Sequence, residues 1–352
     1  MLRLWWYLSK MLLLRWVASA FGLVLLIGFV DSLSKTSEIA DSDGGTGLDY
    51  MVLRAPIIFD QIFLFTLAIA ILLTLVSLIR RNELVAFHGF GMSPTTQLRI
   101  FAPTVIFISI LSGLFIDVRL PASVRALNVW GIADYKGGSI REETPLWLND
   151  QAMNMSVSIT GRIGLDRLTG LTFYIRNADG NLRGVAKAGS ATYEDGAWAL
   201  EDTKVTTLES AEDLLLSRWE TQQSPDLIDR LAAEPRHLNL GDLAQFESLR
   251  GSGSRPSAAY LVWRLKRLTL PLSGLAILIL CIPMMQRLGR RDSGTAAMVF
   301  TLGVSFVFLI VDGIATTLGA KGALSPIIAS IGLSGGLILV GFYLMLRQEI
   351  LE

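Results

Sequence analysis

Three carboxylates stand in or beside long apolar stretches of the sequence, and they are its first candidates for chemistry. They are Asp31, Asp60 and Asp312. An ionisable side chain at membrane depth is costly and usually faces a bundle interior or an aqueous cavity, so we treat these acids as cavity or gate candidates. Asp60 and Asp312 are expected within a turn or two of the membrane interface, where hydration costs little. A plain solvated role therefore stays open for both.

Composition and segment length place these acids in a membrane protein. The chain has 352 residues, of which 51% are hydrophobic and 18% charged, so it is more apolar and less charged than an average soluble domain. Six segments are long and apolar enough to cross a hydrocarbon core of about 30 Å. They are residues 11–30, 57–79, 100–116, 268–285, 296–318 and 324–346. The fold class expected is an α-helical membrane protein with six transmembrane helices.

The Lys and Arg residues of the short connections predict how the chain is oriented. They gather on one side of the expected membrane, at Arg3, Lys10, Arg15, Arg80, Arg81, Arg99, Arg287, Arg290, Arg291 and Arg347. The positive-inside rule makes that side cytoplasmic. Both chain ends are then expected in the cytoplasm, and the long segment 117–259 is expected outside it.

Several common chemistries find no support in the residues present. The formal net charge is zero, which gives no electrostatic footprint for nucleic acid. The single cysteine, Cys281, cannot build a disulfide framework. His88 and His237 are expected on opposite sides of the membrane, so no metal site is predicted. The chain has no G-x-x-x-x-G-K-[ST] loop to hold nucleotide phosphates, so nucleotide chemistry must come from another protein.

The extracytoplasmic segment has the pattern of antiparallel β-structure. Apolar residues such as Leu171, Phe173 and Trp198 alternate with polar ones, and Asp179-Gly180 and Asp195-Gly196 supply hairpin turns. The strands are numerous enough for a sandwich or an open jellyroll, followed by short helices. The three apolar side chains face either a packed core or an apolar groove. The predicted domains are helices in 1–116, the β domain with its short helices in 117–259, and helices in 260–352.

The stretch RRNELVAFHGFGMSP, residues 80–94, separates the second and third apolar segments. Asn82 can cap a helix whose first turn carries Glu83, an acid suited to the positive end of the helix dipole. Gly89 or Gly91 can end that helix in a left-handed turn. The pattern predicts a cytoplasmic helix of about two turns. It is either an interfacial helix anchored by its arginines or a peg that enters a cytoplasmic partner, and the pattern favours neither decisively.

The stretch from residue 80 to 94 carries the most specific family resemblance in the chain. It is similar to the segment R-S-E-L-V-A-x-x-A-x-G-x-S of the LptF/LptG permease family, with His88-Gly89 departing from the usual small or apolar residues. Members of that family form the membrane part of the ABC exporter that extracts lipopolysaccharide from the inner membrane. LTGLTFYIRNADGNL and AGSATYEDGAWALED resemble the family's jellyroll core.

The resemblance extends over essentially the whole chain. YLVWRLKRLTLPLSGLAI resembles the start of span four, and LGAKGALSPIIASI resembles the turn before span six. GFVDSLSK, which closes span one, looks closer to LptG than to LptF. The resemblance implies three spans, a periplasmic β-jellyroll and three further spans in the inner membrane of a Gram-negative bacterium.

The resemblance also implies the partners of the chain and which of them hydrolyses ATP. Residues 80–91 would form the coupling helix seated in the ATPase subunit LptB, with Glu83 pairing with a basic or hydrogen-bonding group there. The coupling candidates are Glu83, Arg80, Arg81, Leu84, Phe87 and His88. The chain itself would bind no cofactor and would not be an enzyme, since ATP and Mg²⁺ belong to the ATPase. The other partners implied are an LptF-like subunit in a heterodimer, a second LptB, LptC and the periplasmic LptA bridge.

Basic side chains near the outer membrane face suit the phosphates of a glycolipid, because Lys and Arg form charge-assisted hydrogen bonds with phosphate. Lys35 is the first candidate, since LptG-like proteins carry substrate-contacting basic residues near the outer end of span one; Arg54 and Lys321 follow. A solvated Lys35 beside Asp31 is the alternative. Spans one and five would form the gates of the cavity, as the resemblance implies.

Two functions of other classes compete with export. An ion-coupled secondary transporter would use Asp60 and Asp312 for protons and would need no ATPase. A non-transporting membrane scaffold would tolerate changes in its spans and only bind periplasmic partners through its β domain. Neither alternative explains a coupling-type helix.

Overall fold

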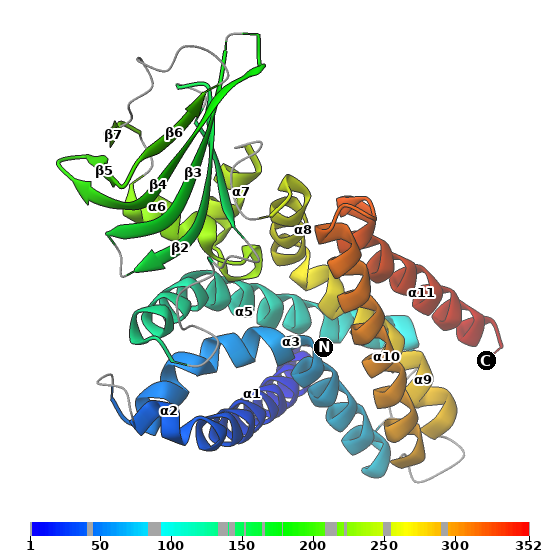
Figure 1. Ribbon diagram of the computed structural model, residues 1–352. Helices are drawn as coiled ribbons and strands as arrows, with labels where there is room; N and C mark the ends of the chain where they lie inside the picture. Colours follow the sequence, from blue (N-terminus) through cyan, green and yellow to red (C-terminus); the bar gives the residue numbers. More distant parts are fainter. Residues whose placement is uncertain are drawn as a thin grey trace. The chain divides into compact units, whose positions relative to one another are not determined.

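The computed structural model divides the chain into two compact units. It describes residues 2–40, 45–83, 93–132, 140, 145–150, 153–163, 166–177, 179–207, 217–221, 224–248, 255–289 and 295–351. The helical unit comprises Met1–Ser34, Gly47–Ser123 and Val262–Glu352, and the β unit comprises Lys35–Thr46 and Val124–Leu261. Figure 1 labels their elements.

Long apolar helices make up the helical unit. The helices are α1 (Leu2–Ser34), α3 (Gly47–Arg80), α5 (Pro94–Trp130), α8 (Ser257–Leu268), α9 (Leu270–Gly289), α10 (Thr295–Ala320), the π-helix η4 (Ile328–Gly332) and α11 (Leu333–Leu351). Residues 124–130 of α5 and 257–261 of α8 are counted in the β unit. Within the described residues, five helices are long and apolar enough to cross a membrane: Arg3–Ser34, Gly47–Arg80, Pro94–Trp130, Ala296–Ala320 and Ile328–Arg347.

The segment expected as the fourth span, residues 268–285, corresponds to α9, and α8 precedes it at a sharp bend. Helices α8 and α9 meet the length and hydropathy criterion only as a pair, and they are bent by 58° at a break around Thr269. The chain continues into Pro271, the second residue of α9. Proline has no N–H and its ring clashes with the carbonyl four residues earlier, so it is tolerated in the first turn of α9 but cannot extend α8. The last turn of α8 therefore ends there, with Lys266 and Arg267 in it.

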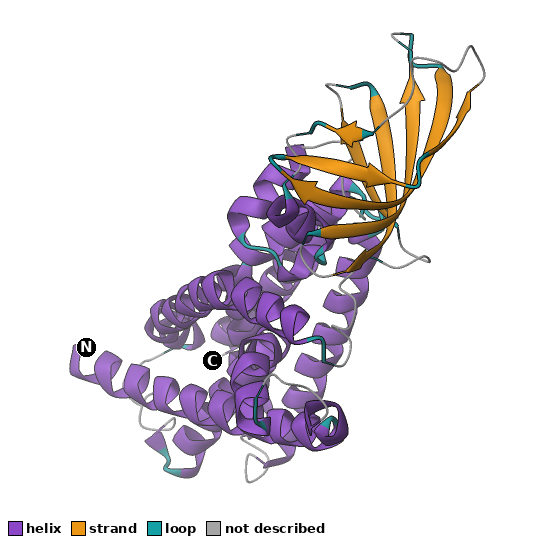
Figure 2. Cartoon of the chain, turned by 60° about the vertical axis from the view of Figure 1, so that its left-hand side comes forward, coloured by secondary structure: helices purple, strands orange, loops and turns teal. Residues whose placement is uncertain are grey.

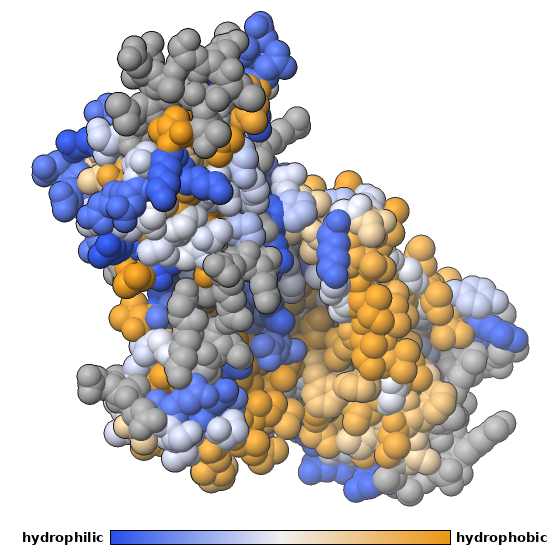
Figure 3. All heavy atoms as spheres, in the orientation of Figure 1, coloured by the Kyte–Doolittle hydropathy of each residue, from blue (hydrophilic) through white to orange (hydrophobic). Residues whose placement is uncertain are grey.

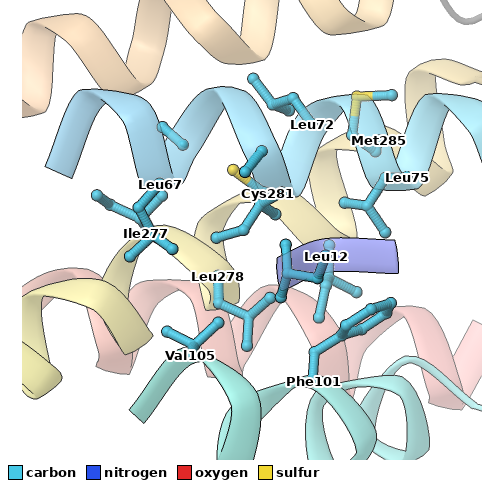
Figure 4. Close-up of a cluster of buried hydrophobic side chains, with 14 of the residues drawn as sticks. Leu12, Leu67, Leu72, Leu75, Phe101, Val105, Ile277, Leu278, Cys281 and Met285 are labelled. Carbon is cyan, nitrogen blue, oxygen red and sulfur yellow. The ribbon is translucent and has the colours of Figure 1, made fainter. Parts of the chain in front are cut away.

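A buried apolar cluster holds α1, α3, α5 and α9 together. Helix α1 packs against α3, α3 packs against α9 and α10, and α9 packs against α10 and α11. Figure 4 shows the centre of this cluster, where the labelled side chains come from α1, α3, α5 and α9. They are Leu12, Leu67, Leu72, Leu75, Phe101, Val105, Ile277, Leu278, Cys281 and Met285, all buried. Outside the cluster, hydrophobic residues gather on the face of the helical unit shown in Figure 3, most clearly over α10.

Small residues let some of these helices approach closely. A Cβ atom added at Gly341 of α11 would lie 2.5 Å from Cγ2 of Ile279 and 3.0 Å from its carbonyl oxygen. Glycine is therefore needed where α11 crosses α9, as is common between transmembrane helices.

The strands of the β unit form one antiparallel sheet (Figure 2). They are β1 (Leu146–Asp150), β2 (Met155–Ile163), β3 (Arg167–Arg176), β4 (Leu182–Glu194), β5 (Ala197–Glu201), β6 (Lys204–Thr207) and β7 (Arg218–Trp219). The order is β1-β2-β3-β4-β5-β7, and β6 pairs with the first half of β4 on the side where β5 pairs with its second half. The antiparallel sheet predicted from the sequence is confirmed.

The Asp195-Gly196 hairpin lies where the sequence predicted it, between β4 and β5. The φ angles of the two residues are 49° and 81°. Two successive left-handed residues define the type I′ turn, whose twist matches that of the flanking strands.

One face of the sheet carries the core of the β unit. Val157, Phe173 and Ala186 lie opposite one another on β2, β3 and β4 and are buried. Phe173 meets Trp219 edge to face at 5.6 Å, and the Trp219 indole N–H donates to Oδ2 of Asp150 at 3.3 Å. Leu171, Phe173 and Trp198, predicted to face a core or a groove, are all buried as a packed core requires.

Short helices complete the β unit: α2 (Thr36–Ala40), α6 (Pro225–Ala232), the 3₁₀-helix η3 (Pro235–His237) and α7 (Leu240–Ser248). Ser224 caps α6 by accepting a hydrogen bond from the Leu227 N–H, and Pro225 occupies the first position of the helix. An ion pair between Arg162 and Asp229, with N···O 2.7 Å, ties α6 to β2.

Candidate functional site

Asp31, near the end of α1, is held by two side chains of α3. The Tyr50 hydroxyl and Nε of Arg54 each donate to Oδ2 of Asp31 at 2.9 Å. These two predicted site residues, Asp31 and Arg54, therefore lie together, and the carboxylate neutralises the guanidinium. Arg54 can bind a phosphate only by sharing or exchanging this partner. Tyr50 was not among the sequence candidates, because a tyrosine near a membrane interface carries no distinctive signal.

The other two basic candidates differ from each other in their partners. Lys35 belongs to the β unit, and its Nζ pairs with Oε1 of Glu38 on α2 at 3.3 Å. Lys321 follows α10 and is exposed, with no ion-pair partner among the residues that the structure describes. The ammonium group of Lys321 is therefore the more available of the two for an anion.

Two ion pairs in the helical unit start from adjacent residues at the end of α8. Lys266 pairs with Asp312 of α10, and both side chains are only 13% exposed. Arg267 donates to Oδ1 of Asp117 on α5 at 3.4 Å. The predicted candidate Asp312 thus carries a compensated charge, while Asp60 lies half-buried on α3. The two pairs connect the bend between α8 and α9 to α5 and α10.

Lys266, Arg267 and Asp117 were not among the candidates that the sequence offered. The signal available was weak: two adjacent basic residues in the last turn of a helix also suit the negative end of its dipole and need no other partner. An acid in an apolar helix does call for a cation. The sequence does not indicate which cation, because the partners are 46 and 150 residues apart.

Glu83 lies just beyond the end of α3 and contacts the start of α1. Its Oε1 accepts a hydrogen bond from the Tyr7 hydroxyl at 3.3 Å, and Nη1 of Arg81 lies 3.9 Å away. Arg80 is exposed in the last turn of α3. Leu84, Phe87 and His88, the other coupling candidates, lie outside the described residues.

The backbone of Asn82 belongs to the end of α3, and the residues after Glu83 that it was expected to cap lie outside the described part of the chain. Its φ is 57°, and its N–H donates to the Ile79 carbonyl at 3.0 Å. An N-cap residue has an extended backbone, whereas a left-handed residue of this kind ends the preceding helix. Asn82 therefore terminates α3, because asparagine tolerates the left-handed region better than most residues.

The apolar helices, the charges neutralised among them and the sheet, whose strands follow α5 and precede α8 in the sequence, define a multi-pass membrane protein with a β unit. The family described as lipopolysaccharide export system permease LptF/LptG matches residues 6–347. The lipopolysaccharide export system permease protein LptG of Escherichia coli strain K12 is 24% identical over 354 residues, covering 97% of this chain and 98% of that protein. The protein of the same name from Escherichia coli O6:H1 strain CFT073 matches equally.

The chain therefore belongs to the LptF/LptG family of lipopolysaccharide export permeases. It is a transporter subunit of the inner membrane rather than a secondary transporter or a scaffold. The family recognised from the sequence is confirmed, and the expected combination of apolar membrane helices with an antiparallel sheet agrees with it.

Proposed function

We propose that this chain is the LptG-like subunit of the lipopolysaccharide exporter and forms a heterodimer with an LptF-like subunit. The family match over residues 6–347 carries the proposal. The two relatives named LptG, aligned over nearly their full length, support the choice of subunit. The heterodimer passes lipopolysaccharide from the inner membrane through LptC to the periplasmic LptA bridge.

In this proposal the chain crosses the membrane six times. Helices α8 and α9 together form the fourth span, with the bend at Thr269 inside or beside the membrane. The Lys and Arg residues of the short connections, interpreted by the positive-inside rule, put both termini in the cytoplasm and the β unit in the periplasm. There the sheet serves as the jellyroll that receives the substrate.

ATP hydrolysis by two LptB subunits, with Mg²⁺, drives the movement. Glu83 is the acid through which this chain couples to the ATPase, and its position between Tyr7 and Arg81 supports that role. Because only Arg81 and Asn82 separate Glu83 from the end of α3, a displacement of the acid is transmitted to that helix. The hydrogen bond from Tyr7 extends the coupling to α1, one of the two proposed gates, the other being α10.

Lys35, Arg54 and Lys321 attract the phosphates of the substrate at the periplasmic face. Lys35 and Arg54 exchange their carboxylate partners for phosphate, and Lys321 binds without such an exchange. Each CH₂ group that leaves an apolar environment costs about 0.8 kcal/mol. Extraction of a lipid with several acyl chains therefore needs both ATP and a sheltered route.

Co-purification of partner proteins tests this proposal. Wild type and Glu83→Arg are isolated from native membranes in mild detergent, and the bound proteins and the ATPase activity are determined. We expect wild type to retain an ATPase and an LptF-like subunit, and Glu83→Arg to retain only the latter. Glu194→Arg, the same change at an exposed acid of the β unit, is the matched control and keeps both. Wild type without an ATPase, or Glu83→Arg with a full complement, would refute the coupling role.

A further inference from the structure

A hollow of about 660 Å³ lies on the sheet face that points away from the core of the β unit. Its lining comes from β1, β2, β3, the turn before β4 and the start of β4: Trp147, Asn149, Ser156, Tyr174, Arg176, Gly180 and Leu182. The buried residues Leu148, Val157 and Phe173 alternate with these and point to the other face. The volume lies in the range of small-ligand pockets.

Two aromatic rings form one wall of the hollow. The ring centroids of Trp147 and Tyr174 lie 5.6 Å apart at an interplanar angle of 30°. Ser156, opposite Asn149 on one side and Tyr174 on the other, is small and leaves the rings accessible. Trp147 stays 40% exposed, although the indole could gain apolar contacts by burial. The pair thus offers two closely spaced, tilted aromatic rings bordered by hydrogen-bonding groups.

The charge around the hollow is positive. Among the described residues, the Arg176 guanidinium has no ion-pair or hydrogen-bond partner, and no acidic side chain lines the hollow. Lys187 and Lys204 lie directly opposite each other on β4 and β6, on the same face as Tyr174. These lysines do not line the hollow, so Arg176 is the one cation in the part of its lining that the structure describes.

We propose that this hollow binds an anionic saccharide. The C–H groups on one face of a sugar ring stack on the negative π-faces of Trp147 and Tyr174. The sugar hydroxyls exchange hydrogen bonds with Asn149 and Ser156, and a phosphate or carboxylate group of the saccharide binds Arg176. A saccharide fits the lining because Asn149 and Ser156 can bind its hydroxyls beside the two rings, while Arg176 can bind its charge.

The identity of the saccharide rests on the proposed function. In a lipopolysaccharide exporter the ligand is the sugar portion of the exported glycolipid, held outside the sheet while the acyl chains travel elsewhere. The hollow would then sense whether the head group has entered the periplasm.

Binding of a soluble sugar to the full chain tests the inference. The purified protein, with the partners that accompany it, is titrated by calorimetry with the phosphorylated oligosaccharide left when lipopolysaccharide is stripped of its acyl chains. We expect saturable binding that Trp147→Ala and Arg176→Gln each weaken roughly tenfold. Arg218→Gln, at an exposed arginine of β7 outside the hollow, is the matched control and leaves binding unchanged. Equal binding by all four proteins would overturn the proposal.

Dephosphorylated sugar separates the two halves of the site. The dephosphorylated sugar should bind wild type roughly tenfold more weakly than the phosphorylated sugar does. Its affinity should be the same for wild type and Arg176→Gln. Its affinity for Trp147→Ala should still be lower. Inorganic phosphate alone should not compete. Tyr174→Phe keeps the ring and checks that a loss does not come from unfolding. If Trp147→Ala instead releases a co-purifying protein and leaves sugar binding intact, the hollow is a protein site and the inference fails.

Failure of this inference and failure of the proposed function give different results. Sugar binding that depends on Trp147 in a protein that assembles with no ATPase supports the saccharide site and refutes the exporter role. An assembled, active exporter whose sugar binding ignores both variants refutes the saccharide site alone.

Discussion

The helical unit exposes large apolar side chains, whereas the β unit exposes mainly polar ones and keeps its large apolar side chains inside. Large apolar side chains are exposed along α10 of the helical unit, among them Val299, Phe300, Phe306, Val307, Ile310 and Val311. The outer face of the β unit instead carries serines, an asparagine and several arginines and lysines, while its interior holds Phe173, Trp198 and Trp219. Each arrangement is stable only in its own solvent, lipid for the first and water for the second.

The interiors differ in the same sense. Buried hydroxyls of the helical unit pair across helices, as in Ser9 with Thr104 at 2.7 Å and Ser273 with Ser334 at 3.0 Å. Association of helices in lipid gains nothing from hiding apolar surface, so packing and polar pairs must supply the specificity. The sheet is instead stabilised mainly by burial of its aromatic core. Substitutions of the same chemistry should therefore have different effects in the two units.

The ion pair between Lys266 and Asp312 should give the largest effect. Lys266→Met leaves Asp312 without its partner among buried surroundings, and we expect a loss of about 3–5 kcal/mol. The measurement is thermal unfolding of the purified protein in mild detergent. The double variant Lys266→Met with Asp312→Leu removes both charges and should recover most of the loss.

A solvent-exposed ion pair in the β unit provides the contrast. Arg167 and Glu201 pair at 3.1 Å on the surface, where both side chains are about half exposed. Arg167→Met should cost no more than about 1 kcal/mol, because water solvates the remaining carboxylate. Equal losses from the two units would contradict the idea that they occupy different solvents.

The next largest effect is expected when an exposed apolar residue of each unit is replaced by aspartate. Val307, near the middle of α10, is 59% exposed, and Ile163 of β2 is 63% exposed. Val307→Asp should cost about 2.5–3.5 kcal/mol of membrane insertion, and Ile163→Asp should change stability by at most about 0.5 kcal/mol. Resistance of each protein to alkaline extraction from membranes, with its melting temperature, measures both. Normal insertion of Val307→Asp would mean that α10 does not face lipid.

Local features of the fold were predictable from sequence, and long-range ones were not. The lengths of apolar runs predict most of the spans, and Asp195-Gly196 predicts its hairpin, because each depends on neighbouring residues. The partner of Asp312 depends on how α8 lies against α10, 46 residues away along the chain. The bend at Thr269 was missed although Pro271 was visible, since a proline can either begin a helix or kink one.

The candidate site divides in the same way. Asp31 and Arg54 were both identified, but their contact with each other and with Tyr50 depends on the packing of α1 against α3. The resemblance to a family supplied the roles of Glu83 and Lys35, which residue pattern alone left open. The Trp147 and Tyr174 pair escaped notice because alternating aromatic residues in strands usually indicate a core.

A smaller effect is expected where the helices approach most closely. Gly341→Ala places a methyl group against Ile279 of α9, including its backbone oxygen, and we expect a loss of about 1–3 kcal/mol from overpacking. Gly336→Ala is the control on the same helix, because a Cβ there meets nothing within 4 Å. The control should be neutral or slightly stabilising, since alanine favours helix. Melting temperatures of the two variants that fall equally would place the close contact elsewhere.

The smallest effect concerns the hydroxyl pair of Ser273 and Ser334, which joins α9 to α11. Both side chains are buried, so simple reasoning about unpaired polar groups predicts a large penalty on removal of either one. A serine in a helix can, however, turn its hydroxyl to a carbonyl of the preceding turn, and the orphaned partner then regains a hydrogen bond. The coupling energy from the cycle of Ser273→Ala, Ser334→Ala and the double variant should therefore be only about 0.6 kcal/mol. Unfolding of the four proteins in detergent measures it. A coupling above about 2 kcal/mol would show that neither hydroxyl can find a second acceptor. Breaking a polar pair inside the helical unit would then be as destabilising as removing apolar contacts from the aromatic core of the sheet.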